Sequence, residues 1–357
     1  MGAPAGAAAA STVAEGQGAR RVLMVFAGQG TQWAGCGREL YETEPAFRRA
    51  VDAVDALNVA WRGQAGFSLR DACFGAPQER LDECELAQPV IFMIEVALTE
   101  LLKTWGVHPG CVIGHSVGEA AAAYAAGHCD LAEAARLVFH RATLEQRTAR
   151  SGRMLAVSLD RAGAEQILRE AGTRALEIAC ENAPASTVIC GPGEDVARAV
   201  AVLERRRVPH RLLRGNVAFH SRAMDVIEAD LRASLAFLDR RRLRAEIPFV
   251  SSVTGEVTDN LDAAYWWSNV RRPVRFMAAV RAAARDFRPD VVLEVSPHPA
   301  LTPAVRQSLA HEDQPPYCVR VLARGEDPRL SLQRALGALY RAGVRTDLAT
   351  ENKVRIE

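Results

Sequence analysis

The sequence predicts an α/β fold in two parts, a large unit of strands and helices and a smaller module inserted into it. Short apolar runs such as 22–26 and 291–295 alternate with longer segments of helical periodicity. Glycine-containing turns follow apolar runs at 28–30 and 114–118. Between 151 and 214 the rhythm changes to six short elements in the order βαββαβ, which is the ferredoxin-like pattern.

The composition is that of a folded protein without a strong charge bias. The chain has 357 residues, of which 49% are hydrophobic and 24% charged, and its formal net charge is +1. This length predicts about two domains with a sizeable core, and the composition excludes an intrinsically disordered chain. A net charge near zero does not create the basic field that attracts nucleic acid or an anionic membrane. We therefore expect neither of these partners.

The eight cysteines are spread along the chain, and no two of them have C-x-x-C spacing. This pattern argues against a structural zinc site and predicts buried free thiols in a reducing compartment. We therefore expect a cytoplasmic protein with no metal site. No run of about 18 apolar residues is present that could span a membrane. Residues 1–20 are rich in alanine and glycine, lack the regions of a secretory signal, and are expected to form a flexible leader or linker.

The first part of the large unit is expected to cover residues 21–150. Apolar residues in 89–105 recur at helical spacing and predict a long, mostly buried helix. Asp130, followed three residues later by Glu133, predicts a helix N-cap with a capping box. The elements expected here are a strand at 22–26, a helix from about 45, a helix at 89–105, a strand at 111–113 and helices at 120–126 and 131–150.

The inserted module is expected to cover residues 151–214, and the large unit to resume at 215–310. The module should contain strands at 154–159, 175–181, 187–190 and 210–213 and helices at 161–170 and 194–206. The resumed unit should contain helices at 224–238 and 275–284 and strands at 248–252 and 291–295. Residues 311–357 are expected to form a C-terminal linker with a helix within 324–345.

Residues 114–118, Gly-His-Ser-Val-Gly, match the G-x-S-x-G pattern directly after a predicted strand. In this pattern a sharp strand-to-helix turn exposes the serine hydroxyl at the N-terminus of the next helix. The backbone N–H of Val117 and the helix dipole can then stabilise an oxyanion. Because a strand is predicted before the motif and a helix after it, we interpret Ser116 as a candidate nucleophile. A chance match of the pentapeptide is the alternative.

A nucleophilic serine needs a general base, and eight histidines are available. His220 ends an apolar segment where a loop begins, and His298 lies in the loop Ser-Pro-His-Pro. Spacing alone does not decide which of these two histidines is the base. For each of them, the alternative is a histidine without a catalytic role that packs in the core or lies at the surface. His115 adjoins the serine but should point away from it in such a turn.

Arg141 is expected on the inward face of the helix at 131–150, because it follows the apolar Leu137 and Val138 at helical spacing. A buried guanidinium needs an anionic partner. That partner can be an internal carboxylate, which would make Arg141 a structural residue. It can also be the carboxylate of a substrate, which a guanidinium holds with two parallel hydrogen bonds.

Four motifs now occur in order: Phe-Ala-Gly-Gln-Gly at 26–30, Gly-His-Ser-Val-Gly-Glu at 114–119, Val-Ala-Phe-His at 217–220 and Leu-Glu-Val-Ser-Pro-His-Pro at 293–299. Together they resemble the acyltransferase domain of a type I polyketide synthase, which is related to malonyl-CoA:acyl carrier protein transacylase. The resemblance covers about residues 21–310. It implies an α/β-hydrolase-like large subdomain with a ferredoxin-like insert, and residues 311–357 resemble a post-acyltransferase linker.

The resemblance implies roles for five residues of the reacting centre. Ser116 would be the nucleophile and His220 its general base. Asn269 lies where the family orients the histidine through a backbone carbonyl, in place of a triad aspartate. The backbone N–H groups of Gln29 and Val117 would form the oxyanion hole.

Further residues would bind the substrate. Arg141 matches the arginine that holds the free carboxylate of a malonyl group, and Gln88 and Asn182 belong to motifs that line the site. Phe219 stands where methylmalonyl-type domains commonly carry serine, so its ring would occupy the space of a 2-methyl branch and favour malonyl. Val217 departs from the malonyl pattern, which usually has histidine there, so methylmalonyl is the alternative extender.

The function implied is the transfer of a malonyl extender unit from malonyl-CoA to the phosphopantetheine of an acyl carrier protein, in polyketide biosynthesis. The transfer would run through an acyl-serine ester in two ping-pong half-reactions. No permanently bound cofactor is expected. The partners would be the acyl carrier protein and a neighbouring ketosynthase domain of the same synthase.

Two other functions remain. A serine hydrolase or thioesterase would use the same serine and histidine, but the sequence has no HGG-type oxyanion motif and a hydrolase does not need Arg141. A non-catalytic docking module of a synthase would not need an intact set of Ser116, His220 and Arg141.

Overall fold

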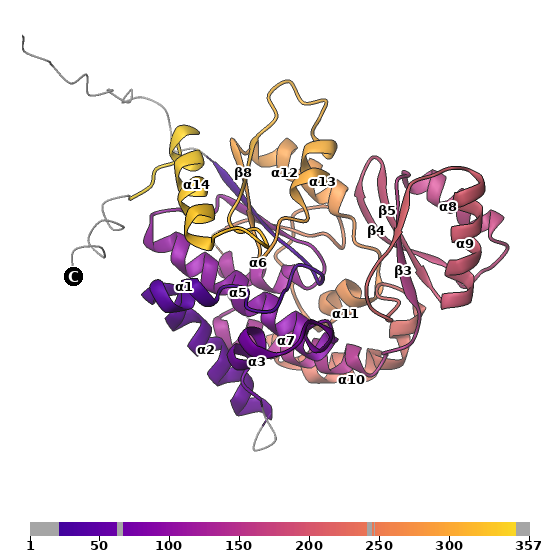
Figure 1. Cartoon of the computed structure of the whole chain (residues 1–357), viewed down its shortest axis with the longest axis horizontal. Helices are drawn as coiled ribbons and strands as arrows, with labels where there is room; N and C mark the ends of the chain where they lie inside the picture. The colour runs from indigo at the N-terminus through magenta and orange to yellow at the C-terminus, as the bar shows by residue number, and fades with distance from the viewer. Residues whose placement is uncertain (1–20, 63–66, 241–244, 246, 348–357) are drawn as a thin grey trace, which may run out of the picture.

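The computed structural model describes residues 21–62, 67–240, 245 and 247–347. The leader predicted at 1–20 and the last ten residues of the predicted C-terminal linker lie outside the described residues. Two separate sheets organise the described chain (Figure 1). This arrangement confirms the predicted α/β fold with an inserted second sheet.

The main sheet has five parallel strands in the order β7-β2-β1-β8-β9. Their bounds are β1 Val22–Phe26, β2 Cys111–Gly114, β7 Phe249–Val250, β8 Val291–Val295 and β9 Tyr317–Arg320. Phe26 pairs with Gly114 on one side and with Val295 on the other. The carboxyl ends of the three central strands are therefore level, and the loops that follow them meet at one edge. Ligands of parallel sheets bind at this edge.

Helices cover both faces of the main sheet, which explains why β1 is apolar along its whole length. Alternate residues of β1 enter different cores, Met24 and Phe26 one of them and Leu23 and Val25 the other. Helices on the first side include α1 Arg38–Thr43, α2 Pro45–Arg62, α3 Leu69–Gly75, α4 Gln78–Leu81, α5 Cys84–Thr104, α6 Gly118–Ala125 and α7 Leu131–Gln146, and α10 Glu228–Leu235, α11 Ala263–Arg271 and α14 Pro328–Arg341 pack into the same core. Helices on the second side are α12 Phe276–Phe287 and α13 Thr302–Ser308.

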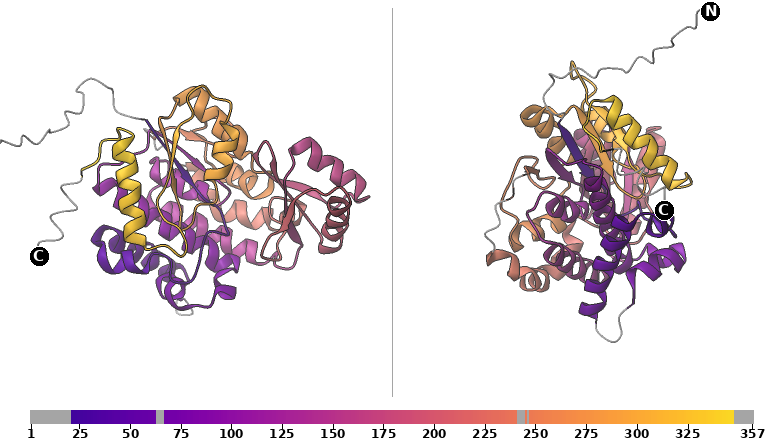
Figure 2. Two further views of the ribbon diagram at one scale, coloured as in Figure 1. Left: turned by 45° about the horizontal axis from the view of Figure 1, so that its top comes forward. Right: turned by 90° about the vertical axis from the view of Figure 1, so that its left-hand side faces the viewer.

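The second sheet has the order β4-β5-β3-β6, and all of its pairs are antiparallel. Its elements are β3 Arg153–Val157, α8 Arg161–Glu170, β4 Glu177–Ala183, β5 Ser186–Gly191, α9 Gly193–Arg205 and β6 His210–Leu212. The two helices pack on one face of the sheet around a core of their own. This βαββαβ unit confirms the predicted ferredoxin-like module. Figure 2 shows it on one side of the molecule, with the yellow helix α14 (Pro328–Arg341) on the other.

Backbone hydrogen bonds tie the small sheet to the large part. The N–H of Glu181 donates to the carbonyl of Val274 at 2.8 Å, and the N–H of Val274 donates to the carbonyl of Ala179 at 2.9 Å. Val274 precedes α12, so β4 is joined to a helix of the main layer. The loops at the carboxyl edge of the main sheet can therefore receive side chains from the small sheet.

Several elements differ from the sequence prediction, and the short helices α1, α3, α4 and α13 were not predicted. The helix expected at 224–238 is divided into η2 Arg222–Ile227, α10 Glu228–Leu235 and η3 Ala236–Arg240. Helix α11, Ala263–Arg271, was not predicted. Strand β9 lies within the segment expected to be a linker, although it pairs with β8. Only Val319 of β9 is buried, because β9 is an edge strand, so the sequence there lacks the apolar run that marks a central strand.

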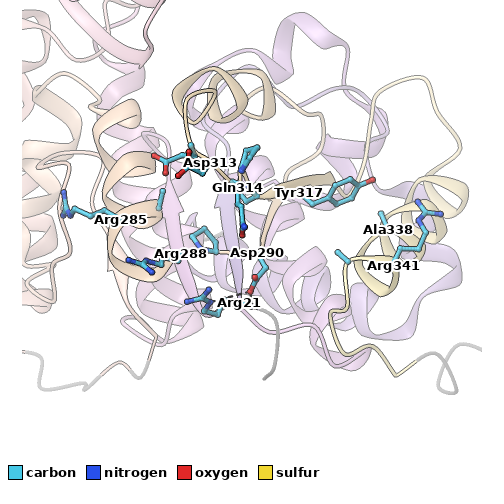
Figure 3. A pocket seen from close by; sticks show the side chains of 15 residues that line it. Arg21, Arg285, Arg288, Asp290, Asp313, Gln314, Tyr317, Ala338 and Arg341 are labelled. Atoms are coloured by element: carbon cyan, nitrogen blue, oxygen red, sulfur yellow. Dashed lines mark hydrogen bonds and ion pairs between the residues drawn. The ribbon is translucent and has the colours of Figure 1, made fainter. Parts of the chain in front are cut away.

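A groove lies at the amino ends of the main strands and is lined by Arg21, Arg285, Asp290 and Arg341, among others (Figure 3). Arg21 precedes β1 and Asp290 precedes β8, so the groove is at the edge of the sheet opposite to Ser116. Within the described ranges, no group of three or more His, Cys, Asp or Glu side chains could hold a metal ion. No helix among the described residues is both long and apolar enough to cross a membrane.

Candidate active site

Ser116 lies in a tight turn between β2 and α6, with a positive φ of 55°. A non-glycine residue in this region is strained, and such strain is concentrated at functional sites. The flanking glycines are required by close contacts. A Cβ at Gly114 would lie 2.1 Å from the Glu119 nitrogen, and a Cβ at Gly118 would lie 2.5 Å from the Phe26 oxygen. The motif is therefore a real elbow that presents the serine, as predicted from its spacing.

The loop after β1 lies directly against this elbow. The His115 N–H donates to the carbonyl of Phe26 at 2.8 Å, and a Cβ at Gly28 would lie 2.9 Å from the His115 carbonyl oxygen. Val117 is the N-cap of α6. Among the described residues, no group of the chain accepts a hydrogen bond from the backbone N–H of Val117 or of Gln29. Val117 directly follows the serine and Gln29 lies in the loop against the elbow, and these are the two donors predicted to face a developing oxyanion.

His220 is 104 residues further along the chain, and its Nε2 lies 2.9 Å from Ser116 Oγ. Its Nδ1 is hydrogen-bonded to the backbone carbonyl of Arg272 at 3.1 Å, which leaves Nε2 to accept the serine proton. His220 also has a positive φ, 58°, so both reacting residues are held in strained conformations. The structure therefore brings His220 to the serine. The other candidate, His298, instead accepts the N–H of Arg324 on its Nδ1.

Burial, the positive charge of Arg141 and the neighbouring His115 together lower the pKa of His220 to about 3, with burial as the largest cause. The backbone carbonyls of Arg272 and Asn269 oppose this effect because they favour the protonated ring. The imidazole is therefore neutral at pH 7 and has a free lone pair on Nε2, as a general base requires.

Asn269, in the last turn of α11, contributes through its side chain. Its Nδ2 donates to the carbonyl of Ser116 at 3.1 Å and to Glu119 Oε2 at 2.8 Å. The hydrogen bond that fixes the His220 ring goes to the carbonyl of Arg272, three residues after Asn269. Asn269 therefore holds the elbow itself, a contact that the sequence analysis did not predict.

Glu119 is a fully buried carboxylate that the sequence analysis did not assign to a role. Besides Asn269, it accepts the Tyr265 hydroxyl at 2.7 Å and both the N–H and the hydroxyl of Ser252, at 2.6 and 2.8 Å. Burial raises the pKa of Glu119, and these donors lower it. The network joins α6, α11 and the loop after β7 beneath Ser116. Its partners come from distant segments, so no local pattern could have indicated it.

Arg141 is on α7, with its side chain 3% exposed, and also reaches the serine hydroxyl. Its Nη2 lies 3.1 Å from Ser116 Oγ, and its Nη1 donates to Gln88 Oε1 at 2.7 Å. Its Nη2 also lies 3.3 Å from Glu145 Oε1, one helical turn further along α7. Of the two predicted alternatives, the internal carboxylate is present, as Glu145, and the binding of a substrate carboxylate by Arg141 stays a prediction. The i, i+4 spacing of Arg141 and Glu145 was the sequence signal for this pair.

The other three predicted substrate-binding residues, Gln88, Asn182 and Phe219, differ in how they contact the residues around Ser116. Gln88 donates from Nε2 to Glu145 Oε2 at 2.5 Å and to Gln29 Oε1 at 3.2 Å, so it links the β1 loop to α7. Asn182 of β4 is hydrogen-bonded through Oδ1 to Nε2 of His115 at 2.8 Å, which joins the small sheet to the elbow. Phe219 is half-buried and packs against the larger core. Its role in substrate selection stays a prediction.

His115 points away from the serine hydroxyl, as expected. Its ring packs 5.5 Å from the ring of Phe276, measured between centroids, and burial lowers its pKa.

The sequence matches the family described as "Acyl transferase domain" over residues 23–345. The chain belongs to this family. It is 38% identical over 342 residues to the "Mycocerosic acid synthase-like polyketide synthase" of Mycobacterium tuberculosis (strain ATCC 25618 / H37Rv), a match that covers 94% of this chain and 16% of that protein. The acyltransferase chain thus spans about a sixth of the length of this relative.

Solved structures agree with this assignment. The acyltransferase domain from the second module of the salinomycin polyketide synthase is 34% identical, with a TM-score of 0.84 and coverage of 94% of this chain and 76% of that one. A loading acyltransferase from the avermectin modular polyketide synthase is 32% identical, with a TM-score of 0.81 and coverage of 89% and 99%. The predicted resemblance to polyketide synthase acyltransferase domains is therefore confirmed.

Proposed function

We propose that this acyltransferase moves an acyl group, malonyl in the first place, from a coenzyme A thioester to the phosphopantetheine thiol of an acyl carrier protein. One observation carries the proposal. Ser116 Oγ lies between His220 Nε2, at 2.9 Å, and Arg141 Nη2, at 3.1 Å. A nucleophile, a base and a cation that can hold an acyl group thus meet at one atom.

In the first half-reaction, Ser116 Oγ attacks the thioester carbonyl carbon while His220 Nε2 takes the hydroxyl proton. The carbonyl oxygen becomes an oxyanion, for which the N–H groups of Val117 and Gln29 and the N-terminus of α6 are the donors. The intermediate collapses, the carbon–sulfur bond breaks, and His220 returns the proton to the sulfur of coenzyme A. An acyl ester on Ser116 remains.

In the second half-reaction, the carrier protein's thiol attacks the ester carbonyl while His220 accepts its proton. The carbon–oxygen bond to Ser116 then breaks, and His220 gives the proton back to Oγ. The carrier leaves as an acyl thioester, and the enzyme is restored. The low pKa of His220 keeps the ring neutral at the start of both steps.

Two residues support malonyl as the acyl group. Arg141 is the charged donor next to Ser116, and a guanidinium fits the carboxylate of a malonyl group. Phe219, directly before His220, would crowd a 2-methyl branch, so methylmalonyl is the second candidate. The acyl carrier protein and a neighbouring ketosynthase domain are the proposed partners, because the relative quoted above is a polyketide synthase much longer than this chain.

Intact-mass spectrometry after incubation with malonyl-CoA tests the proposal. The unmodified protein should gain the mass of one malonyl group, and Ser116→Ala should gain none. Ser158→Ala, which changes an exposed serine on the small subdomain, is the matched control and should be labelled normally. Labelling of the Ser116→Ala protein would overturn the assignment of the nucleophile.

A hydrolase would transfer the acyl group to water, whereas an acyltransferase needs the carrier protein as acceptor. Coenzyme A release with and without carrier protein therefore distinguishes the two functions. Release of coenzyme A should stop after one turnover when carrier protein is omitted and should continue when it is added. Continued release at full rate without carrier would favour a thioesterase. Absence of any acyl-enzyme with a panel of acyl-CoA thioesters would favour a docking module.

A further inference from the structure

Glu145 is a buried carboxylate beside the arginine that the proposed function assigns to the acyl group. Its side chain is 1% exposed, and its Oε1 lies 3.3 Å from Arg141 Nη2. Its Oε2 accepts Gln88 Nε2 at 2.5 Å. Glu145 thus already makes an ionic contact with this guanidinium, which is the contact that a substrate carboxylate would also make.

Two of the three guanidinium nitrogens of Arg141 already contact groups of the chain. Nη1 donates to Gln88 Oε1, and Nη2 contacts both Ser116 Oγ and Glu145 Oε1. Within the described part of the chain, only Nε has no hydrogen-bond partner. A guanidinium binds a carboxylate best through two parallel N–H groups, so a second carboxylate must share Arg141 with Glu145 or displace it.

The charges lead to the same conclusion. One cation and one carboxylate add to zero, so the ion pair offers little net attraction to an anionic acyl group. A malonyl carboxylate next to Arg141 would bring two like charges together in a buried site, where such contacts are costly. Burial also raises the pKa of Glu145, while the neighbouring Arg141 and the hydrogen bond from Gln88 lower it.

We propose that Glu145 is a specificity-determining residue, an internal carboxylate that competes with the substrate carboxylate for Arg141 and so weakens the preference of this site for carboxylated over neutral acyl groups. Glu145 acts through Arg141 and does not need to contact the reacting atoms. The proposal rests on the proposed function, since it assumes that the acyl group is carried on Ser116 next to Arg141.

The test compares acylation of Ser116 by malonyl-CoA and by propionyl-CoA, which has no free carboxylate. Single-turnover measurements separate the concentration for half-maximal rate from the maximal rate. Glu145→Gln keeps the shape and the Gln88 contact but removes the charge. Glu133→Gln, at the start of the same helix, is the matched control, because glutamine can also complete the capping box there.

In Glu145→Gln, the malonyl-CoA concentration for half-maximal rate should fall at least about tenfold, because a buried like-charge contact is removed. The propionyl-CoA value and both maximal rates should change less than about twofold, and the control should match the unmodified protein. Glu145→Met, a second neutral residue of similar length, should give the same shift in the ratio. It serves in place of the glutamine variant if that protein does not fold.

The decisive quantity is the ratio of the malonyl-CoA to the propionyl-CoA concentration that gives half-maximal acylation. If this ratio is unchanged in both neutral variants, the proposal is overturned, but the proposed function stays intact as long as Ser116 is still acylated. Parallel losses for both thioesters would assign Glu145 a structural role and also overturn it. Lack of acylation of the unmodified protein by either thioester overturns the proposed function itself.

Discussion

Replacing Arg141 by methionine should destabilise the protein mainly through the carboxylate that it leaves behind. Glu145 would stay buried, with Gln88 Nε2 as its remaining hydrogen-bond donor among the contacts described above. Removing one member of a buried ion pair typically costs about 3–5 kcal/mol of unfolding free energy. The functional effect of Arg141 would be mixed with this structural loss, so stability is the quantity to measure.

The cost can be worked out from the titration of Glu145. Without its cation, the buried carboxyl keeps a proton in the folded state, whereas in the unfolded chain it ionises with its ordinary pKa of 4.5. pH 7 is about 2.5 pH units above the ordinary pKa of 4.5, and keeping the carboxyl protonated costs about 1.36 kcal/mol for each of these units. The folded state therefore loses about 3.4 kcal/mol of unfolding free energy at pH 7. The folded state then binds more protons than the unfolded state. The penalty therefore grows as the pH rises and falls to less than about 1 kcal/mol at pH 5.

Urea unfolding of four proteins tests this prediction: the unmodified chain, Arg141→Met, Glu145→Met and the double variant. Each single substitution should lower the unfolding free energy by about 3–5 kcal/mol at pH 7, and the double variant should recover about 3 kcal/mol relative to the sum of the single losses. The deficit of Arg141→Met should shrink at pH 5. Additive losses, or a deficit that does not change with pH, would refute the reasoning that the two side chains form a coupled buried pair.

Two further predictions concern the base and the substrate. Acylation of Ser116 by propionyl-CoA should keep nearly the same rate constant between pH 7 and pH 5, because the pKa of His220 is about 3 and the ring stays neutral. A base with the ordinary pKa of about 6.5 would instead lose about 30-fold at pH 5, and a loss of that size would contradict the buried, neutral His220. Phe219→Ser should raise the use of methylmalonyl-CoA relative to malonyl-CoA by about 5- to 150-fold, since removing an overpacked contact returns about 1–3 kcal/mol. Competition between the two thioesters measures this ratio, and an equal ratio in both proteins would remove Phe219 from the selection of the extender.

Local patterns predicted much of the fold. Asp130 and Glu133 form the capping box that their spacing indicated, and α8 and β8 have the predicted bounds. In each case the interaction lies within one turn or one strand, so neighbouring residues carry the whole signal. Helix α11 and strand β9 were missed because their formation depends on packing against segments far away in the chain.

The sequence by itself determined the elbow at Ser116, through glycines spaced between a predicted strand and a predicted helix, and the inward face of α7 that carries Arg141. It left the base open between His220 and His298, and it left the partner of Arg141 open between a substrate and an internal carboxylate. Only the tertiary structure decided these points. It placed His220 Nε2 2.9 Å from Ser116 Oγ across 104 residues and put Glu145 against the guanidinium. The physical reason is that strand pairing aligns the carboxyl ends of β1, β2 and β8 and so brings loops that are distant in sequence to one edge. The spacing of Arg141 and Glu145 on α7 allowed their ion pair but did not decide it.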